Sequence, residues 1–188
     1  MPVEWSRIAR RIRVPMGFLF AAVFLWLARP TPVSLVWSLL LVVPGLWLRG
    51  YAAGYVKKNS ELTTTGPYAY TRNPLYLGSM LIAFGFAAAS KSIVIVALLA
   101  LLFAVIYVPV IRSEEAFLRS KFPGFDAYAA SVPRLLPRLR ANRMAGPGDE
   151  KDAGSFSFPL YRKHREYNAL MGATALYAVL ALRIIFKH

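Results

Sequence analysis

Five stretches without a charged residue constrain the fold of this 188-residue chain most strongly. No Asp, Glu, Lys or Arg occurs in residues 14–28, 30–48, 73–90, 92–111 or 167–182. A helix needs about 20 apolar residues, at roughly 1.5 Å each, to cross a hydrocarbon core of about 30 Å. With flanking residues included, the sequence predicts an all-α integral membrane protein of about five transmembrane helices, over 14–29, 32–56, 74–90, 92–112 and 167–186.

The positions of the basic residues predict how these spans are oriented. Of the 23 Lys and Arg residues, 18 fall within residues 1–15, 57–74 and 112–167. Basic residues collect on the cytoplasmic side of a membrane. We therefore predict a single membrane domain, 1–188, in the cell (inner) membrane with a cytoplasmic N-terminus. Segments 57–73 and 113–166 would form a small cytoplasmic cap, with a flexible linker over 141–155.

Composition excludes several classes of function. The net charge of +14 is accounted for by attraction to anionic lipid headgroups, and no nucleic-acid recognition motif accompanies it. We therefore expect the bilayer, and no nucleic acid, as a partner. The chain has no cysteine, and its two histidines are His164 and His188. We therefore expect no metal site of the usual Cys/His kind.

The first candidate site segment is TTTGPYAYTRNPLYLGSM, residues 63–80. Its Gly-Pro pair predicts a turn, and Pro74 suits the first turn of a helix. In a purely structural interpretation Asn73 caps that helix and the tyrosines form an interfacial aromatic belt. That interpretation does not explain why so many donors and acceptors converge before one apolar segment.

The second candidate segment follows the fourth span. Glu114 and Glu115 come directly after the apolar run, next to Arg112. They could be surface carboxylates, with Glu115 and Arg119 at helical i,i+4 spacing. An ionisable group at the mouth of a membrane bundle instead suggests a function. Both candidate segments leave the membrane on the same predicted face, so we expect them to meet over a shared cavity.

Together the two segments carry a resemblance. The string LTTTGPYAYTRNPLYLG, followed about 35 residues later by RSEEAFLRSKFPGFDAYAASVPRLLP, resembles the isoprenylcysteine carboxyl methyltransferase and phospholipid methyltransferase superfamily of integral membrane enzymes. The likeness covers roughly residues 45–140 and includes LRGYA in the second span. It implies a methyltransferase that uses S-adenosyl-L-methionine and acts on a membrane-embedded or amphiphilic acceptor, either a lipid or a prenylcysteine-like carboxylate or amine.

The resemblance also implies site residues. Arg72 or Arg112 would pair with the methionine carboxylate, and Arg112, Glu115 and Arg134 are the catalytic candidates, Glu115 or Tyr128 serving as base for an amine acceptor. The residues implied to bind the cofactor are Ser60, Glu61, Leu62, Thr63, Tyr68, Arg72, Asn73, Pro74, Leu75, Tyr76 and Glu114.

The chain departs from the family pattern at two places. Asn73 stands where the family has a histidine, so this position keeps a donor and an acceptor but has no titrating base. The arginine that the prenylcysteine enzymes use for substrate aligns near Val110, and Arg112 or Arg134 would substitute for it. Both departures bear on the choice of acceptor.

Other functions stay open at this point. A sterol-type membrane reductase would have a similar fold and use NADPH. A non-catalytic membrane scaffold or lipid-binding protein would tolerate replacement of Tyr68, Tyr76 and Glu114. The last span either completes the bundle or mediates formation of a homo-oligomer.

Overall fold

The computed structural model of the protein describes residues 3–57, 61–141 and 155–186, and every regular element in these ranges is helical. This confirms the predicted all-α class. The long helices are α1 (Val3–Leu27), α2 (Pro32–Ala53), α3 (Pro74–Ala89), α4 (Ile93–Leu102), α5 (Val108–Lys121) and α8 (Tyr167–Ile185). Shorter elements are α6 (Phe125–Ser131), α7 (Phe158–Lys163), the 3-10 helix η1 (Gly66–Ala69) and the π-helix η2 (Phe103–Tyr107).

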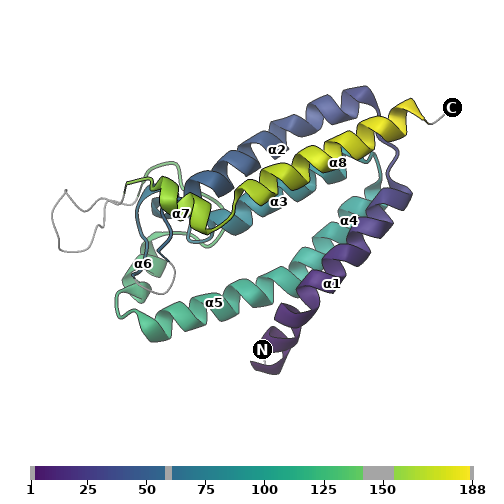
Figure 1. Ribbon diagram of the computed structural model, residues 1–188. Helices are drawn as coiled ribbons and strands as arrows, with labels where there is room; N and C mark the ends of the chain where they lie inside the picture. Colours follow the sequence, from purple (N-terminus) through teal and green to yellow (C-terminus); the bar gives the residue numbers. More distant parts are fainter. Residues whose placement is uncertain (1–2, 58–60, 142–154, 187–188) are drawn as a thin grey trace. The chain divides into compact units, whose positions relative to one another are not determined.

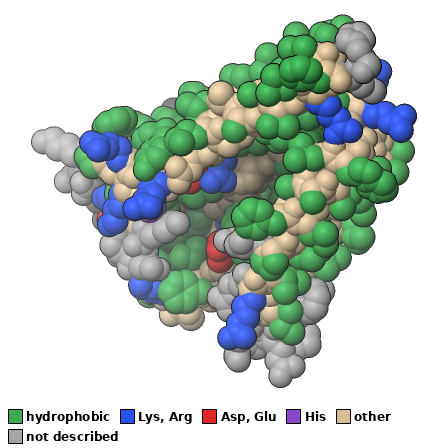
Figure 2. Space-filling view, turned by 45° about the vertical axis from the view of Figure 1, so that its right-hand side comes forward, with side chains coloured by type: hydrophobic (Ala, Val, Ile, Leu, Met, Phe, Trp, Pro, Cys, Tyr) green, Lys and Arg blue, Asp and Glu red, His purple; other side chains and the backbone are tan. Residues whose placement is uncertain are grey.

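Three helices in the described chain are long and apolar enough to cross a membrane. They are α2, α8 and the continuous helix Ile93–Lys121 formed by α4, η2 and α5. The apolar helices Pro15–Leu27 and Pro74–Ala89 are shorter, and their crossing of the bilayer stays a prediction. On the face drawn in Figure 2 hydrophobic side chains predominate along the helices. The protein is therefore a membrane protein, with apolar helix surfaces that suit lipid.

A proline explains the π-helix in the long helix Ile93–Lys121. Pro109 has no backbone N–H to donate to Val105, and its ring would clash with that carbonyl in a regular α-helix. Here the helix takes in one extra residue per turn: the N–H of Val108 bonds to the carbonyl of Phe103, five residues earlier. The helix thus passes through the proline without ending.

The described chain forms two compact units. The first comprises Met1–Val42, Ala83–Phe117 and Ala175–His188, and the second comprises Val43–Ile82 and Leu118–Thr174. The helices α2, α3, α5 and α8 each contribute to both units. Of these, α2, α3 and α8 run side by side (Figure 1).

In the first unit, tight turns and small polar residues hold the helices together. Thr31 and Ser34 cap α2 reciprocally, each backbone N–H bonding to the other's side-chain oxygen at 2.9 and 3.2 Å, which is a capping-box arrangement. Ser34 Oγ also donates to the carbonyl of Ala89 at 2.8 Å. Between α3 and α4 the chain turns at Lys91, whose φ is 54°.

The same unit fixes the end of α8 on α2 and α3. The hydroxyls of Ser38 and Tyr177 lie 2.7 Å apart, and the ring of Tyr177 packs against Phe86 with centroids 4.7 Å apart. A Cβ on Gly85 would lie 2.6 Å from Val42. The small residues of α3 therefore allow close helix packing, as is common in membranes.

In the second unit α2 and α3 touch through their backbones. A Cβ on Gly45 would lie 2.8 Å from the carbonyl oxygen of Gly78, and the reverse distance is also 2.8 Å. Gly78 lies against the stem of Arg49, 2.6 Å from the position of an added Cβ. Glycine at both positions lets Arg49 reach across the face of α3.

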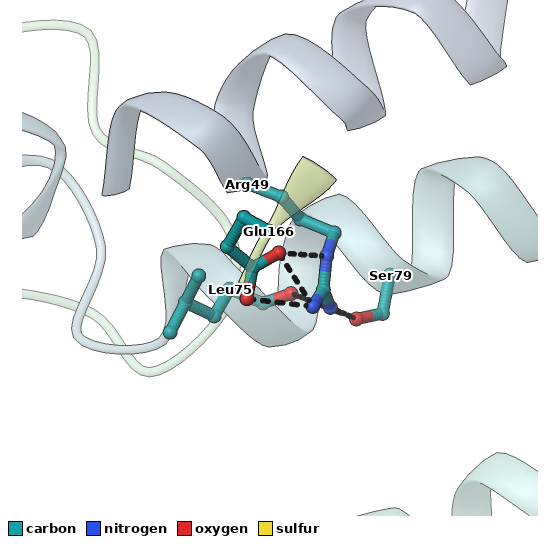
Figure 3. Close-up of polar contacts among 4 residues, drawn as sticks. All are labelled: Arg49, Leu75, Ser79 and Glu166. Carbon is teal, nitrogen blue, oxygen red and sulfur yellow. Dashed lines mark hydrogen bonds and ion pairs between the residues drawn. The ribbon is translucent and has the colours of Figure 1, made fainter. Parts of the chain in front are cut away.

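Arg49 connects α2, α3 and the start of α8 (Figure 3). Its Nε and Nη2 atoms donate to the two carboxylate oxygens of Glu166, each at 3.0 Å. Its Nη1 atom donates to Ser79 Oγ and, at 3.4 Å, to the carbonyl of Leu75. The side chains of Arg49 and Glu166 are 24% and 11% exposed. A forked, charge-assisted pair of this kind satisfies a cation inside an apolar helix.

We expect Glu166→Gln to destabilise the protein by roughly 1–3 kcal/mol, because it leaves Arg49 without a counter-charge in an apolar setting. Thermal unfolding of the purified protein in detergent would measure the loss. The control replaces both partners, Arg49→Met with Glu166→Leu, and should be less destabilised than Glu166→Gln. An unchanged melting temperature for Glu166→Gln would show that the ion pair contributes nothing to the bundle.

Candidate functional site

The two sequence segments that carry the motifs are joined by hydrogen bonds in the second unit. The hydroxyl of Tyr128 donates to the carbonyl of Tyr68 at 2.7 Å and is buried. The backbone N–H of Arg72 donates to the carbonyl of Pro133 at 2.9 Å, and the N–H of Arg138 donates to the carbonyl of Tyr70 at 3.0 Å. The Gly-Pro-Tyr loop, residues 66–73, and the Val-Pro-Arg segment, residues 132–138, therefore pair directly. That they share a site stays a prediction.

Two side chains strengthen this contact at the start of α3. Thr71, which is buried, donates from Oγ1 to the carbonyls of Arg134 and Leu135 at 3.2 and 3.1 Å. The side-chain amide of Asn73 donates to the carbonyl of Arg134 at 3.0 Å. Asn73 thus binds the opposite segment through its side chain, and its carbonyl accepts the first backbone hydrogen bond of α3, from Leu77 at 3.0 Å. Pro74 begins α3, as predicted.

A small apolar core lies beneath these contacts. It consists of the buried side chains Phe125, Tyr128 and Val132, with Leu62 of the loop packed against them. Phe125 and Tyr128 lie on the short helix α6, which sequence reasoning did not predict. Residues three apart share a helix face, and Asp126 in the first turn suits the helix dipole. Helix α6 therefore carries the Tyr128 hydroxyl to the loop.

The loop that precedes η1 holds the first group of residues implied to bind the cofactor. Glu61 is exposed and pairs with Lys57, with 2.6 Å between Oε1 and Nζ. Thr63 Oγ1 accepts from the backbone N–H of Lys57 at 3.3 Å. Leu62 is half-buried against the α6 core. Ser60 lies outside the described residues.

The second group lies around the start of α3. Tyr68 and Pro74 are buried, whereas Arg72, Asn73, Leu75 and Tyr76 are half-buried. The carbonyl of Leu75 accepts from Arg49, so the Arg49–Glu166 pair also steadies the first turn of α3. The structure thus brings Leu62, Tyr68, Asn73 and the backbone of Arg134 into one unit.

The catalytic candidates on α5 belong to the first unit. Arg112 and Glu114 are exposed, and Glu115 is 5% exposed. A carboxyl group buried to this degree usually has a specific partner or a function. Arg119, one turn further on, pairs with Asp126 at 2.6 Å. That Arg112, Glu114 and Glu115 complete a site with the loop stays a prediction, and so does the catalytic role of Arg134, whose side chain is exposed.

The second unit also contains a pocket of about 710 Å³ that sequence reasoning did not single out. A drug-sized ligand occupies a volume of this order. The residues that line it are Trp47, Leu48, Tyr51, Gly66, Pro67, Ala69, Tyr70, Thr71, Leu77, Pro137 and Ala141. They include none of the residues implied to bind the cofactor.

Aromatic residues at the end of α2 form one side of this region. The Tyr51 and Tyr55 hydroxyls lie 3.0 Å apart. Its hydrogen bond with Tyr51, and next its burial, raise the pKa of Tyr55 to about 12. Tyr55 is therefore a neutral phenol at physiological pH, able to share a hydrogen bond with Tyr51.

Two charged residues that sequence reasoning did not pair are Arg49 and Glu166. Arg49 is the one charged residue of the predicted span 32–56, and an ionisable residue in a span calls for a partner. That signal pointed to Arg49 but not to Glu166, which is 117 residues away. Within the described ranges no group of three or more His, Cys, Asp or Glu side chains could hold a metal ion.

Comparison with known proteins gives two relatives with substantial identity. The cobalt-zinc-cadmium resistance protein CzcN of Cupriavidus metallidurans is 43% identical over 104 residues, which cover 55% of this chain and 47% of the relative. The nickel-cobalt-cadmium resistance protein NccN of Alcaligenes xylosoxydans xylosoxydans is 42% identical over 107 residues, 57% of this chain and 49% of the relative. The matches thus span about half the length of each relative. No solved structure matches the chain.

A family model gives the classification. The model that describes phospholipid methyltransferases matches residues 33–124. The matched range includes α2, α3 and the helix Ile93–Lys121, and with them the Gly-Pro-Tyr loop and the acidic pair. Residues 33–124, just under half of the chain, therefore match the phospholipid methyltransferase family, part of the integral membrane methyltransferase superfamily that also includes the isoprenylcysteine enzymes.

Proposed function

We propose that the protein is an S-adenosyl-L-methionine-dependent methyltransferase that acts on a membrane-embedded or amphiphilic acceptor. The observation that carries this proposal is the match of residues 33–124 to the phospholipid methyltransferase family. The hydrogen bonds between the Gly-Pro-Tyr loop and the Val-Pro-Arg segment support it. These bonds join two motifs typical of the superfamily, and every regular element among the described residues is helical.

The cofactor would lie against the loop and the first turn of α3. Aromatic faces attract a sulfonium cation, and Tyr68 and Tyr76 are the aromatic residues of this set. Arg72 would pair with the methionine carboxylate in a forked hydrogen bond. Glu114 would accept hydrogen bonds from the ribose hydroxyls or from the amino group. The loop is fixed by the Tyr128 hydroxyl and by Asn73, so these two residues would position the cofactor site.

The reaction is an in-line displacement. A lone pair of the acceptor attacks the methyl carbon, the carbon–sulfur bond breaks, and its electron pair leaves with a neutral thioether. Such a leaving group needs no acid, so catalysis depends mainly on positioning and exclusion of water. A carboxylate acceptor needs no base, whereas an ammonium must first lose a proton. The buried Glu115 is the candidate base. Tyr128, whose hydroxyl donates to Tyr68, fits a positioning role better.

The membrane orientation belongs to the same proposal. An excess of Lys and Arg in residues 1–15, 57–74 and 112–167 supports a cytoplasmic N-terminus and a cytoplasmic cofactor site in the inner membrane. The acceptor would reach the site from the bilayer, and the cofactor would reach it from the cytoplasm.

A part in metal resistance is a second candidate function. The names of the two relatives favour it, since both are named as resistance proteins for cobalt and cadmium together with zinc or nickel. The two candidates are compatible if methylation alters a membrane component on which resistance depends. Growth in cobalt or cadmium of a host that expresses wild-type protein or Glu114→Ala would separate them. If the wild-type protein and Glu114→Ala protect the host equally against the metal, resistance does not depend on methyl transfer.

We expect the purified protein to bind S-adenosylhomocysteine and not NADPH in calorimetry. Glu114→Ala should weaken this binding at least tenfold, because a charged hydrogen bond to the ribose or amino group contributes about 1.5–3 kcal/mol. Asp126→Ala is the matched control: it removes a carboxylate from an exposed ion pair with Arg119, and such pairs contribute little. Binding of NADPH instead would favour the sterol-type reductase. If neither ligand binds, the non-catalytic scaffold or lipid-binding protein is the remaining alternative.

We expect Asn73→Ala to weaken S-adenosylhomocysteine binding, because it removes the hydrogen bond to the carbonyl of Arg134. The loss should be about three- to tenfold, in line with one hydrogen bond of about 1 kcal/mol. Asn73→His restores a donor and the family residue, so it should bind nearly as well as wild type. If Asn73→Ala and Asn73→His bind equally, Asn73 does not position the site through its amide.

A further inference from the structure

The pocket of about 710 Å³ has an apolar and aromatic lining. Trp47 stacks on Tyr51 with centroids 5.1 Å apart and an interplanar angle of 15°. On Tyr51 a second ring, that of Phe156, lies nearly parallel at 6.1 Å and 10°. None of the lining residues is charged. A charged cofactor would lose its hydration there without compensation, so this pocket suits the apolar part of a ligand.

The position of the pocket indicates where that ligand comes from. Trp47, Leu48 and Tyr51 lie in the last two turns of α2, a helix long and apolar enough to span the membrane. The other walls include Pro67 and Tyr70 of the connecting loop. Trp and Tyr are enriched where a span meets the headgroup region. The pocket therefore lies at the depth of lipid headgroups and upper acyl chains.

Basic residues lie beside the pocket. The N–H of Arg138 bonds to the carbonyl of Tyr70, which lines the pocket. Pro137 and Ala141 also line it, and between them come the exposed residues Arg138 and Arg140. A guanidinium binds phosphate oxygens well through its forked donors. The guanidinium of Arg138 donates to the carbonyl of Ser131, so Arg140 is the arginine of this segment that we assign to a phosphate. An apolar cavity with an arginine beside it matches a molecule with an apolar chain and an anionic phosphate.

We propose that this pocket binds an anionic phospholipid, with an acyl chain against Trp47 and Tyr51 and the phosphate at Arg140. None of the residues implied to bind the cofactor lines this pocket, although Tyr68 and Arg72 are neighbours in sequence of lining residues, and the proposal does not depend on methyltransferase activity. The bound lipid would join the end of α2 to the 133–141 segment, which also holds the Gly-Pro-Tyr loop. The interaction would therefore stabilise the cap on an anionic membrane surface.

Native mass spectrometry of the full chain in detergent, with phosphatidylglycerol or phosphatidylcholine added, tests the proposal. We expect wild-type protein to retain phosphatidylglycerol several-fold more than phosphatidylcholine. Trp47→Ala should bind phosphatidylglycerol about tenfold more weakly, because one aromatic wall is lost. Trp37→Ala is the matched control, since Trp37 is also on α2, is 66% exposed against 65% for Trp47, and does not line the pocket.

Arg140→Glu tests the position that the proposal assigns to the lipid headgroup. It should lower phosphatidylglycerol binding at least fivefold, because one basic residue near an anionic lipid contributes about 1 kcal/mol. Phosphatidylcholine binding should fall less, because the choline cation offsets the charge of its phosphate. Arg162→Glu is the control, an exposed arginine on α7 that does not lie between lining residues. If both arginine variants lose binding equally, the attraction is diffuse and the assigned headgroup position is wrong.

A second variant, which fills the pocket, tests the proposal even if Trp47→Ala does not fold. Ala141 is exposed and lines the pocket, so Ala141→Trp should fill it without disturbing the Trp47–Tyr51 stack. We expect this variant to melt at the wild-type temperature and to retain several-fold less phosphatidylglycerol. Undiminished retention by a folded Ala141→Trp would overturn the proposal, and so would equal retention of the two lipids by wild-type protein.

Discussion

The hydrogen bonds between residues 68–73 and 128–138 are the constraint on which the cap depends. The loop has no regular structure apart from the 3-10 turn η1, and the 133–140 segment has none because Pro133 and Pro137 prevent a helix. Each therefore needs the other to satisfy its backbone groups, and buried polar groups left unsatisfied are costly. The Tyr128 hydroxyl, Thr71 and Asn73 supply side-chain bonds that make the contact specific. The methyltransferase site that we propose would depend on this contact between chain segments.

The Arg49–Glu166 pair connects this cap region to the helices. Arg49 belongs to the segment that matches the phospholipid methyltransferase family, and Glu166 lies beyond it, directly before α8. The carboxylate compensates a charge that would be unfavourable among apolar helices. Since Arg49 also donates to Leu75, the C-terminal segment supports the start of α3. Helix α8 is therefore part of the bundle. A role for it in oligomer formation stays a prediction.

Sequence reasoning predicted the helical class and the regions of contact better than the contacts themselves. The charge-free stretch 73–90 and Pro74 located α3, which begins at Pro74. The family motifs identified the two segments that pair. The π-helix before Pro109 and helix α6 were missed, because both arise from how a short segment satisfies its hydrogen bonds and buries Phe125. Glu166, the partner of Arg49, lies 117 residues away, so the local sequence around Arg49 could not identify it. Whether the acidic pair on α5 meets the loop stays a prediction.

Hydrogen–deuterium exchange of the protein in detergent, with and without S-adenosylhomocysteine, tests the central claim most directly. If residues 66–76 and 125–138 form one cofactor-binding structure, their amides should slow together when the ligand binds. Amides at the centre of α4 should not change, since they are not part of that structure. Protection of both segments at the same ligand concentration is the predicted result. Exchange that is unchanged in both segments at saturating ligand would contradict the account.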